Sequence, residues 1–190
     1  MLKKGFFVHT ELSEEEVNKL FSTKVIGKVG DLPIKKQIPS FENKSLTFCS
    51  YFCEGYEKGY HSKGIVFQTK EKPIYAIPTD SWSFMRSGVW LPNHEQFVFN
   101  SIEEMLEKYP KGIQFEKDFQ KYFQKLSPEE VYPTHSKQDA ELFYEMDYCN
   151  KSIKEKPYNE VAFLTPVKIE PLAKFSNYEE LYNFWNKFKE

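Results

Sequence analysis

The chain has 190 residues, of which 40% are hydrophobic and 28% are charged, a composition typical of one globular domain with a buried core. Its formal net charge of −2 gives no overall field that would draw it to nucleic acid or to an anionic membrane, so the charge does not indicate a nucleic-acid partner. It lacks a long apolar run, a signal-peptide-like start and paired cysteines, so the sequence predicts no membrane partner and a cytoplasmic location.

The first part of the chain predicts one strand, one helix and a long loop. Residues 5–10 (GFFVHT) predict the strand. Ser13 begins a capping box with Glu16, and the apolar residues that follow at helical spacing predict a helix ending near Thr23. Residues 27–44 contain glycines and prolines without a periodic apolar pattern, so we expect a long loop there.

The next segment is predicted to supply most of the strands. Residues 45–52 (SLTFCSYF) alternate between apolar and polar positions, as a half-buried strand does. Residues 64–69 and 74–77 predict a hairpin across the polar residues between them, and residues 96–99 (QFVF) predict a further strand. The pattern of residues 82–90 does not distinguish helix from strand.

The second half is predicted to be mainly helical. Helices are expected at residues 101–110, 115–126 and 137–149, from Ser127 onward, and from Ser176 to about Phe188. The helix at 137–149 carries Leu142, Phe143, Met146 and Cys149. Residues 161–169 (VAFLTPVKI) predict one late strand that Pro166 weakens.

Together these patterns predict an α+β fold, because strands and helices are segregated along the chain rather than alternating. We expect a single domain over residues 1–190 with a compact, mostly antiparallel β core. That core is expected to come from residues 5–10, 45–100 and 161–169, with helices mainly in the second half.

Aromatic residues make up 17% of the chain, and such rings either fill a core or line a pocket for a flat ligand. Both interpretations stay open for Tyr51, Tyr56 and Tyr60. The sequence lacks the glycine-rich nucleotide motifs, the GxSxG and HExxH motifs and the paired-cysteine zinc patterns. It also lacks a carboxylate cluster, so no metal site and no metal-dependent phosphoryl chemistry is predicted.

Arg86 is the only arginine among 26 basic residues. Lysine cannot reproduce the planar guanidinium fork, so Arg86 is a candidate for bidentate recognition of a phosphate or carboxylate. His94 and Glu95 follow it closely and are further candidates, with Glu95 as a base or as a group that stabilises positive charge. The alternative is that Arg86 forms an internal ion pair with Asp80 or Glu95.

Two further candidates lie at strand ends, where side chains can reach a cleft. His9 and Thr10 end the first predicted strand and could present an imidazole and a hydroxyl to a ligand. Glu160 comes directly before the late strand and could project into the same cleft. The alternatives are a loop histidine that contacts backbone and a solvated carboxylate.

The order of a strand ending in His9-Thr10, a helix, the strand SLTFCS and the late segment NEVAFLTPVKIEPLAKF resembles the ADP-ribosyltransferase-type fold. The resemblance implies NAD bound between two small sheets, with His9, then Ser45 or Tyr51, then Glu160 around it. Residues 60–67 (YHSKGIVF) are similar to a segment of bacterial abortive-infection-type proteins, and residues 137–147 (KQDAELFYEMD) to a later one. The arginine that normally follows the acidic pair is missing here.

Two function hypotheses follow. The first is an NAD- or nucleotide-binding, ADP-ribosyltransferase-like enzyme acting in phage–host conflict, with His9, Tyr51 and Glu160 catalytic. The second is a non-catalytic phage or host-defence protein that sequesters a nucleotide signal or blocks a partner protein. Ligand contacts are expected from a set of polar residues: Thr10, Ser45, Tyr60, His61, Arg86, His94 and Glu95. The enzyme hypothesis requires His9 and Glu160 to converge on one ligand.

Overall fold

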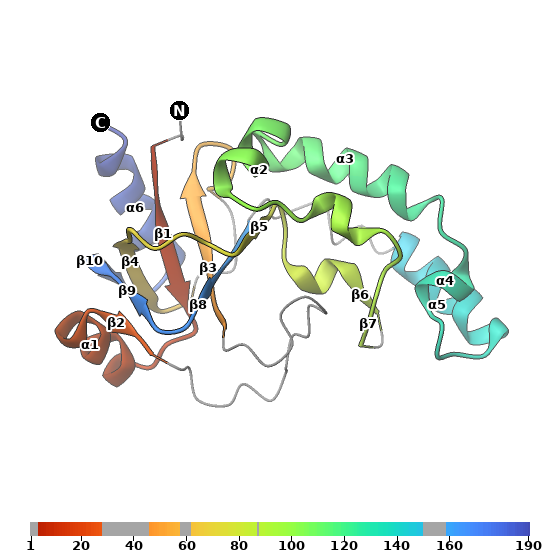
Figure 1. Cartoon of the computed structure of the whole chain (residues 1–190), viewed down its shortest axis with the longest axis horizontal. Helices are drawn as coiled ribbons and strands as arrows, with labels where there is room; N and C mark the ends of the chain where they lie inside the picture. Colours follow the sequence, from red (N-terminus) through yellow and green to blue (C-terminus); the bar gives the residue numbers. More distant parts are fainter. Residues whose placement is uncertain (1–3, 28–45, 58–61, 87, 150–158) are drawn as a thin grey trace.

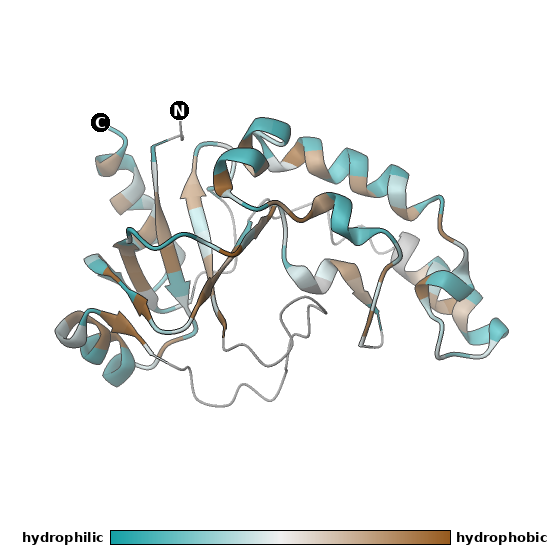
Figure 2. Ribbon diagram, in the orientation of Figure 1, coloured by the Kyte–Doolittle hydropathy of each residue, from teal (hydrophilic) through white to brown (hydrophobic). Residues whose placement is uncertain are grey.

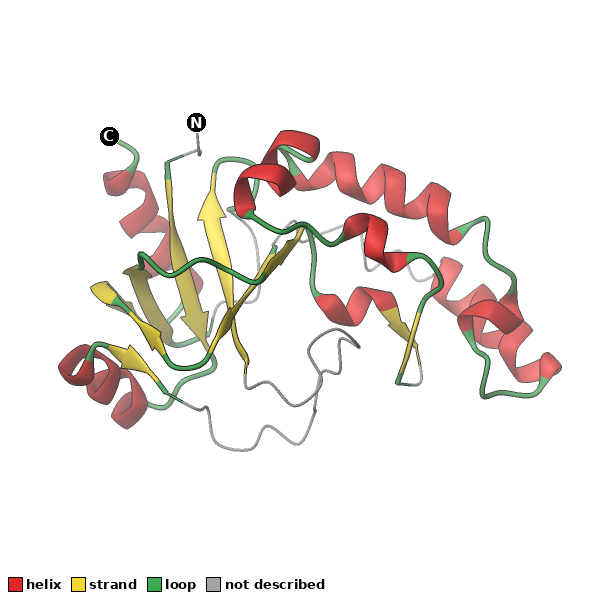
Figure 3. Ribbon diagram, in the orientation of Figure 1, coloured by secondary structure: helices red, strands yellow, loops and turns green. Residues whose placement is uncertain are grey.

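The computed structural model describes residues 4–27, 46–57, 62–86, 88–149 and 159–190. A β-sheet with a helix against each face forms one side of the molecule, which we call the sheet lobe (Figures 1 and 3). Residues 81–97 and 112–149 form the helical lobe on the other side. Among the described residues, no helix combines the length and the apolar character needed to cross a membrane.

The sheet has six strands in the order β10-β4-β1-β3-β8-β5, and all neighbours are antiparallel. The strands are β1 (Gly5–Thr10), β3 (Leu46–Cys53), β4 (Gly64–Gln68), β5 (Tyr75–Ile77), β8 (Glu160–Leu164) and β10 (Glu170–Phe175). The short strands β2 (Val25–Ile26) and β9 (Val167–Lys168) pair separately. This arrangement confirms the predicted α+β class with its mainly antiparallel β core.

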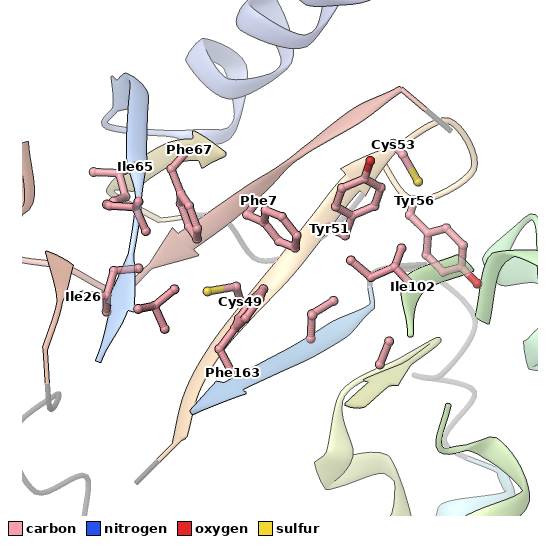
Figure 4. Packing of buried hydrophobic residues seen from close by; sticks show 14 of the residues in the cluster. Phe7, Ile26, Cys49, Tyr51, Cys53, Tyr56, Ile65, Phe67, Ile102 and Phe163 are labelled. Carbon is pink, nitrogen blue, oxygen red and sulfur yellow. The ribbon is translucent and has the colours of Figure 1, made fainter. Parts of the chain in front are cut away.

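The side chains of each strand point alternately to one face of the sheet and to the other, and both faces are apolar. Phe7, Cys49 and Phe163 point to one face and pack with residues of α1 (Glu14–Thr23) and α2 (Ile102–Lys108), as Figure 4 shows for the strand residues. Their neighbours in sequence point to the other face, because successive side chains of a strand alternate. There Phe6 stacks on Phe52 and is covered by α6 (Tyr178–Phe188).

The helices of the sheet lobe begin where the sequence predicts. Ser13 caps α1 in a reciprocal capping box with Glu16, and Val17 and Leu20 form its buried face. Asn177 caps α6, whose apolar stripe packs on the sheet. Figure 2 shows hydrophobic residues following the strands while the helices carry mixed surfaces, as expected of elements with one buried face.

The helical lobe is built around aromatic rings. Its elements are the 3₁₀ turns η2 (Ser81–Phe84) and η3 (His94–Phe97), the hairpin β6 (Met85–Arg86) and β7 (Val89–Trp90), and the helices α3 (Gly112–Phe123), α4 (Pro128–Val131) and α5 (Lys137–Cys149). Phe84, Phe97 and Phe119 pack with ring centroids 5.4 to 6.2 Å apart. Much of the unusual aromatic content therefore fills a core, as Tyr56 also does beneath α2.

The predicted hairpin of residues 64–69 and 74–77 is wrong. Both strands exist, but β4 pairs with β1 on one side and β10 on the other, while β5 pairs with β8 at the opposite edge of the sheet. Since β4 already has two partners, no edge of it is left for β5. Since β5 is four antiparallel neighbours away from β4, the two strands run in the same direction, and the polar residues between them do not form the expected reversal.

Two other strand predictions also need correction. Residues 96–99 are not a strand, because η3 extends to Phe97 and only Phe99 forms a bridge, with Ala76. Residues 161–169 are two strands rather than one, since β8 ends at Leu164 and β9 begins at Val167, beyond a proline that cannot donate a hydrogen bond. The edge strand β10, which follows, was not predicted.

Candidate functional site

The sequence candidates fall in three separate places. His9, Thr10 and Tyr51 lie in the middle strands of the sheet, and Glu160 begins β8. Arg86, His94 and Glu95 belong to the helical lobe. Ser45, Tyr60 and His61 lie outside the described residues.

His9 is a buried, neutral histidine. Its Nδ1 donates a hydrogen bond to the Phe48 carbonyl oxygen over 3.0 Å, and because a carbonyl only accepts, the proton must sit on Nδ1. Its Nε2 is left as an acceptor that has no hydrogen-bond partner in the described part of the chain. Burial lowers the pKa of His9, and the Phe48 carbonyl, Glu16 and Glu11 oppose that change.

Thr10 and Tyr51 both make contacts within the sheet. Thr10 pairs with Gly64 at the end of β1. Tyr51 is buried and packs edge-on against Phe7, and burial raises the pKa of its hydroxyl. The Asn159 side chain forms hydrogen bonds with both backbone groups of Tyr51. It accepts from the Tyr51 N–H over 2.7 Å and donates to the Tyr51 carbonyl oxygen over 2.8 Å. This pair of hydrogen bonds anchors the start of β8 to β3.

Glu160 lies in a buried polar cluster with two hydroxyl groups. Tyr75 donates to its Oε1 over 2.9 Å, and Ser81 donates to its Oε2 over 3.2 Å. Burial, followed by the charge of Glu160, raises the pKa of Tyr75 and of the Cys49 thiol. Tyr75 and Ser81 could not be recognised in the sequence, because neither belongs to a motif and only the pairing of β5 with β8 brings them to Glu160.

His9 and Glu160 lie on opposite faces of the sheet. His9 pairs with Ile65, whose side chain belongs to the face beneath α1, whereas Glu160 pairs with Ile77, on the face toward the helical lobe. The pairing of both strands with β3 leads to the same conclusion. Val8 pairs with Ser50 and Val161 pairs with Cys49, the residue next to Ser50. His9 therefore shares a face with Val161, and Glu160, one residue before Val161, points to the other face. The expected convergence of His9 and Glu160 on one ligand is therefore not met, because each strand position fixes the face of its side chain.

Arg86 has an internal role in the helical lobe. Its Nη1 donates to the carbonyl oxygens of Ser83 and Met85 at 3.2 and 2.8 Å, and its guanidinium lies 5.7 Å from the centre of the Phe123 ring. These contacts hold the β6–β7 hairpin against α3. Both hydrogen bonds are internal to the protein and use backbone carbonyl oxygens.

Glu95 and Arg86 both act on the hydroxyl of Tyr122, and His94 lies beside Glu95. Burial raises the pKa of Tyr122, Glu95 adds to that effect and Arg86 opposes it, so both charges act on this hydroxyl. His94 is buried, stacks on Trp90 at 4.5 Å and donates from Nδ1 to the Leu91 carbonyl oxygen at 2.8 Å. The Glu95 carboxylate is 3.7 Å from the same nitrogen and largely exposed, so the nearer carbonyl receives the hydrogen bond.

The most exposed apolar feature of the helical lobe lies on α5. Leu142, Phe143 and Met146 are 54%, 37% and 50% exposed, and we call these three residues the α5 strip. The opposite side of the helix is buried, because Ala140 lies in the aromatic core and Tyr144 stacks on Phe123 at 5.2 Å. The sequence predicted this helix and its apolar residues but not that they face outward.

Comparisons with protein-family models, with curated proteins and with solved structures each found no match. Within the described ranges, no group of three or more His, Cys, Asp or Glu side chains is arranged to hold a metal ion. Three arrangements thus remain to be explained: the buried His9, the Glu160 cluster and the α5 strip.

Proposed function

We propose that this chain is a non-catalytic binding protein that occupies a surface of a partner protein through its helical lobe. The observation that carries the proposal is the α5 strip. Single exposed apolar side chains are normal on a soluble domain, but adjacent ones on a helix form a patch of the kind that marks interaction sites.

The geometry of α5 favours binding of a protein surface. Leu142 and Met146 are four residues apart and lie one above the other on the same face of the helix, with Phe143 beside them. Such spacing supplies the anchors that helix-mediated complexes use. Ala140 and Tyr144 pack the other side of the helix against the aromatic core, so its apolar side faces outward from a packed helix.

The transferase hypothesis has less support. Its two central residues, His9 and Glu160, point to opposite faces of the sheet, and Tyr51 packs in the core. Groups that act on one ligand must lie within hydrogen-bond reach of it. The hydroxyls around Glu160 explain its burial without a substrate.

The test is site-specific photo-crosslinking from the α5 strip. A photoreactive phenylalanine analogue replaces Leu142, and a matched variant carries it in place of Leu164, which is 47% exposed at the end of β8 in the sheet lobe. We expect a discrete crosslinked protein from position 142 alone. The crosslinked protein, once purified, should bind wild-type chain and lose at least about tenfold in affinity for a Leu142→Ser/Met146→Ser variant.

Two results would contradict this function. One is equal crosslinking from positions 142 and 164, which would indicate non-specific contact. The other is turnover of NAD by the wild-type chain that a Glu160→Gln variant loses while keeping its fold, which would restore the enzyme hypothesis.

A further inference from the structure

The charge around the α5 strip narrows the kind of partner it fits, if the proposed protein-binding function holds. Residues 127–147 contain six carboxylates and one lysine, whereas the whole chain carries a net charge of only −2. Negative charge is thus concentrated on α4 and α5. An exposed concentration of one charge steers association toward a partner of the opposite charge.

The helical geometry places two of these carboxylates along one border of the strip. Successive residues of an α-helix are about 100° apart, so Leu142 lies about 200° from both Ala140 and Tyr144, on the outer side of α5. Glu141 and Glu145 are exposed, four residues apart, and follow the edge of that outer side next to Leu142. The strip is therefore an apolar ridge with an acidic margin.

The exposed end of α4 extends the same charge. Glu129 and Glu130 are exposed in the first turn of α4, which packs against α5. Phe143 contacts this region through Tyr132 and His135, with ring centroids 5.6 and 5.1 Å away. Phe143 lies on the side of the strip away from Glu141 and Glu145, so α4 adds negative charge on the other side of the strip.

We infer that the partner of the α5 strip is an amphipathic helical segment whose apolar side is bordered by lysine or arginine. Its apolar residues would pack on Leu142, Phe143 and Met146, and its basic residues would lie against Glu141 and Glu145. A second copy of the chain fits poorly, because pairing α5 with itself brings these carboxylates together. Nucleic acid and anionic membranes fit poorly for the same electrostatic reason.

The experiment measures binding of three synthetic peptides to the full chain by fluorescence anisotropy. Each is a 16-residue amphipathic helix with the same leucine and phenylalanine face, and the flanking positions are all lysine, all glutamine or all glutamate. We expect the lysine peptide to bind tightest and the glutamate peptide weakest. Raising the salt from about 50 mM to about 500 mM should bring the lysine and glutamine peptides to similar affinities.

Variants separate the charge from the apolar contact. Glu141→Gln/Glu145→Gln should weaken the lysine peptide roughly fivefold to tenfold and leave the glutamine peptide unchanged, since each exposed charge pair contributes little by itself. Leu142→Ser/Met146→Ser should weaken both peptides at least about tenfold. Leu164→Ser, the same kind of change on an exposed leucine in the sheet lobe, should have no effect on either.

The outcomes distinguish this inference from the function on which it rests. Equal binding of the lysine and glutamine peptides at low salt, lost in Leu142→Ser/Met146→Ser, overturns the basic partner and keeps protein binding through the strip. Self-association through α5, seen as a dimer in sedimentation that Leu142→Ser/Met146→Ser abolishes, also overturns the basic partner. No binding of any peptide, together with no specific crosslink from position 142, overturns both.

Discussion

At the scale of single residues, His9 shows how burial selects one protonation state. The Phe48 carbonyl fixes the proton on Nδ1, and the surrounding core disfavours a second proton on Nε2. A buried polar atom without a hydrogen bond costs stability, so its presence requires a physical explanation. Here the bond to Phe48 fixes the orientation of the ring, and Nε2 is the atom left over.

The first prediction concerns the effect of pH on stability through His9. Its folded-state pKa is lowered, so below pH about 6.5 the unfolded chain binds a proton that the folded chain does not. The free energy of unfolding therefore does not depend on the protonation of His9 above that pH. As the pH falls below it, the free energy of unfolding decreases, by up to about 2 kcal/mol at pH about 5. Urea unfolding of wild type and His9→Asn at several pH values measures the difference.

Asparagine can still donate to the Phe48 carbonyl but does not titrate, so the variant should show a shallower fall in stability toward acid. It should also be less stable at every pH, because the smaller side chain leaves a cavity. The same acid dependence in both proteins would show that proton uptake occurs elsewhere.

The second prediction concerns the hydroxyls that hold Glu160. Tyr75→Phe removes a hydrogen bond to a buried carboxylate and should lower the free energy of unfolding by about 1–3 kcal/mol. Tyr182→Phe, which removes a hydroxyl from a 40% exposed tyrosine, should change it by less than about 0.5 kcal/mol. Equal effects of the two substitutions in denaturant unfolding would contradict a specific role of the Tyr75 hydroxyl.

At the scale of elements, the position of β4 between β1 and β10 depends on Gly64. A Cβ at this position would lie 2.2 Å from the His9 carbonyl oxygen and 2.8 Å from the Phe175 ring. Both contacts are far closer than van der Waals distance, and one is with backbone that cannot swing aside. The same strand that presents Ile65 opposite His9 thus requires a residue without a side chain at its start.

The third prediction follows from this close approach. Gly64→Ala should lower the free energy of unfolding by about 2–3 kcal/mol or more, through overpacking of the sheet. Gly27→Ala is the matched control, because nothing lies within 4 Å of a Cβ there, and it should be neutral or stabilising by up to about 1 kcal/mol. Thermal or denaturant unfolding compares them, and equal stability of the two variants would contradict the tight packing at Gly64.

The outer strand β10, at one edge of the sheet, is irregular. The outer strand β10 contains Pro171 and a register shift between Pro171 and Ala173, and both features interrupt the row of hydrogen-bonding groups. Such interruptions prevent another strand from adding to an edge. This leaves the helical lobe, rather than β10, as the surface we expect a partner to use.

At the scale of the molecule, the sheet and helical lobes share strands. Val161 of β8 packs in the core beneath α1, while its neighbour Ala162 packs in the aromatic core of the helical lobe. In β5, Tyr75 packs in the aromatic core of the helical lobe, and its neighbour Ala76 packs in the core beneath α1. Neither core can therefore be opened without disturbing strands that the other needs.

The fourth prediction is that the two lobes unfold together, as the single-domain prediction requires. Hydrogen exchange in increasing urea should show the slowest amides of β3 and α3 converging on one opening free energy and one urea dependence. Mass spectrometry of peptic fragments can follow both elements in one sample. Loss of protection in α3 at a urea concentration that leaves β3 protected would indicate two independent units.

The amino-acid sequence alone determined the features that depend on near neighbours. The caps at Ser13, Ser101 and Ser127 and the periodicity after them predicted three helices, because a helix bonds residues four positions apart. The last helix was predicted to begin at Ser176, and its cap is the next residue, Asn177. The segregation of strands from helices predicted the α+β class, and the first strand was predicted with its observed limits.

Only the tertiary structure decided which strands pair and which face each side chain takes. Gly64 pairs with Phe175, far along the chain, and no local signal encodes that choice. One step in register moves a side chain to the other face, so the separation of His9 from Glu160 required the assembled sheet. The outward position of Leu142 and Met146 likewise depended on Ala140 and Tyr144 finding the aromatic core, because an apolar pattern predicts a helix but not which of its sides is covered.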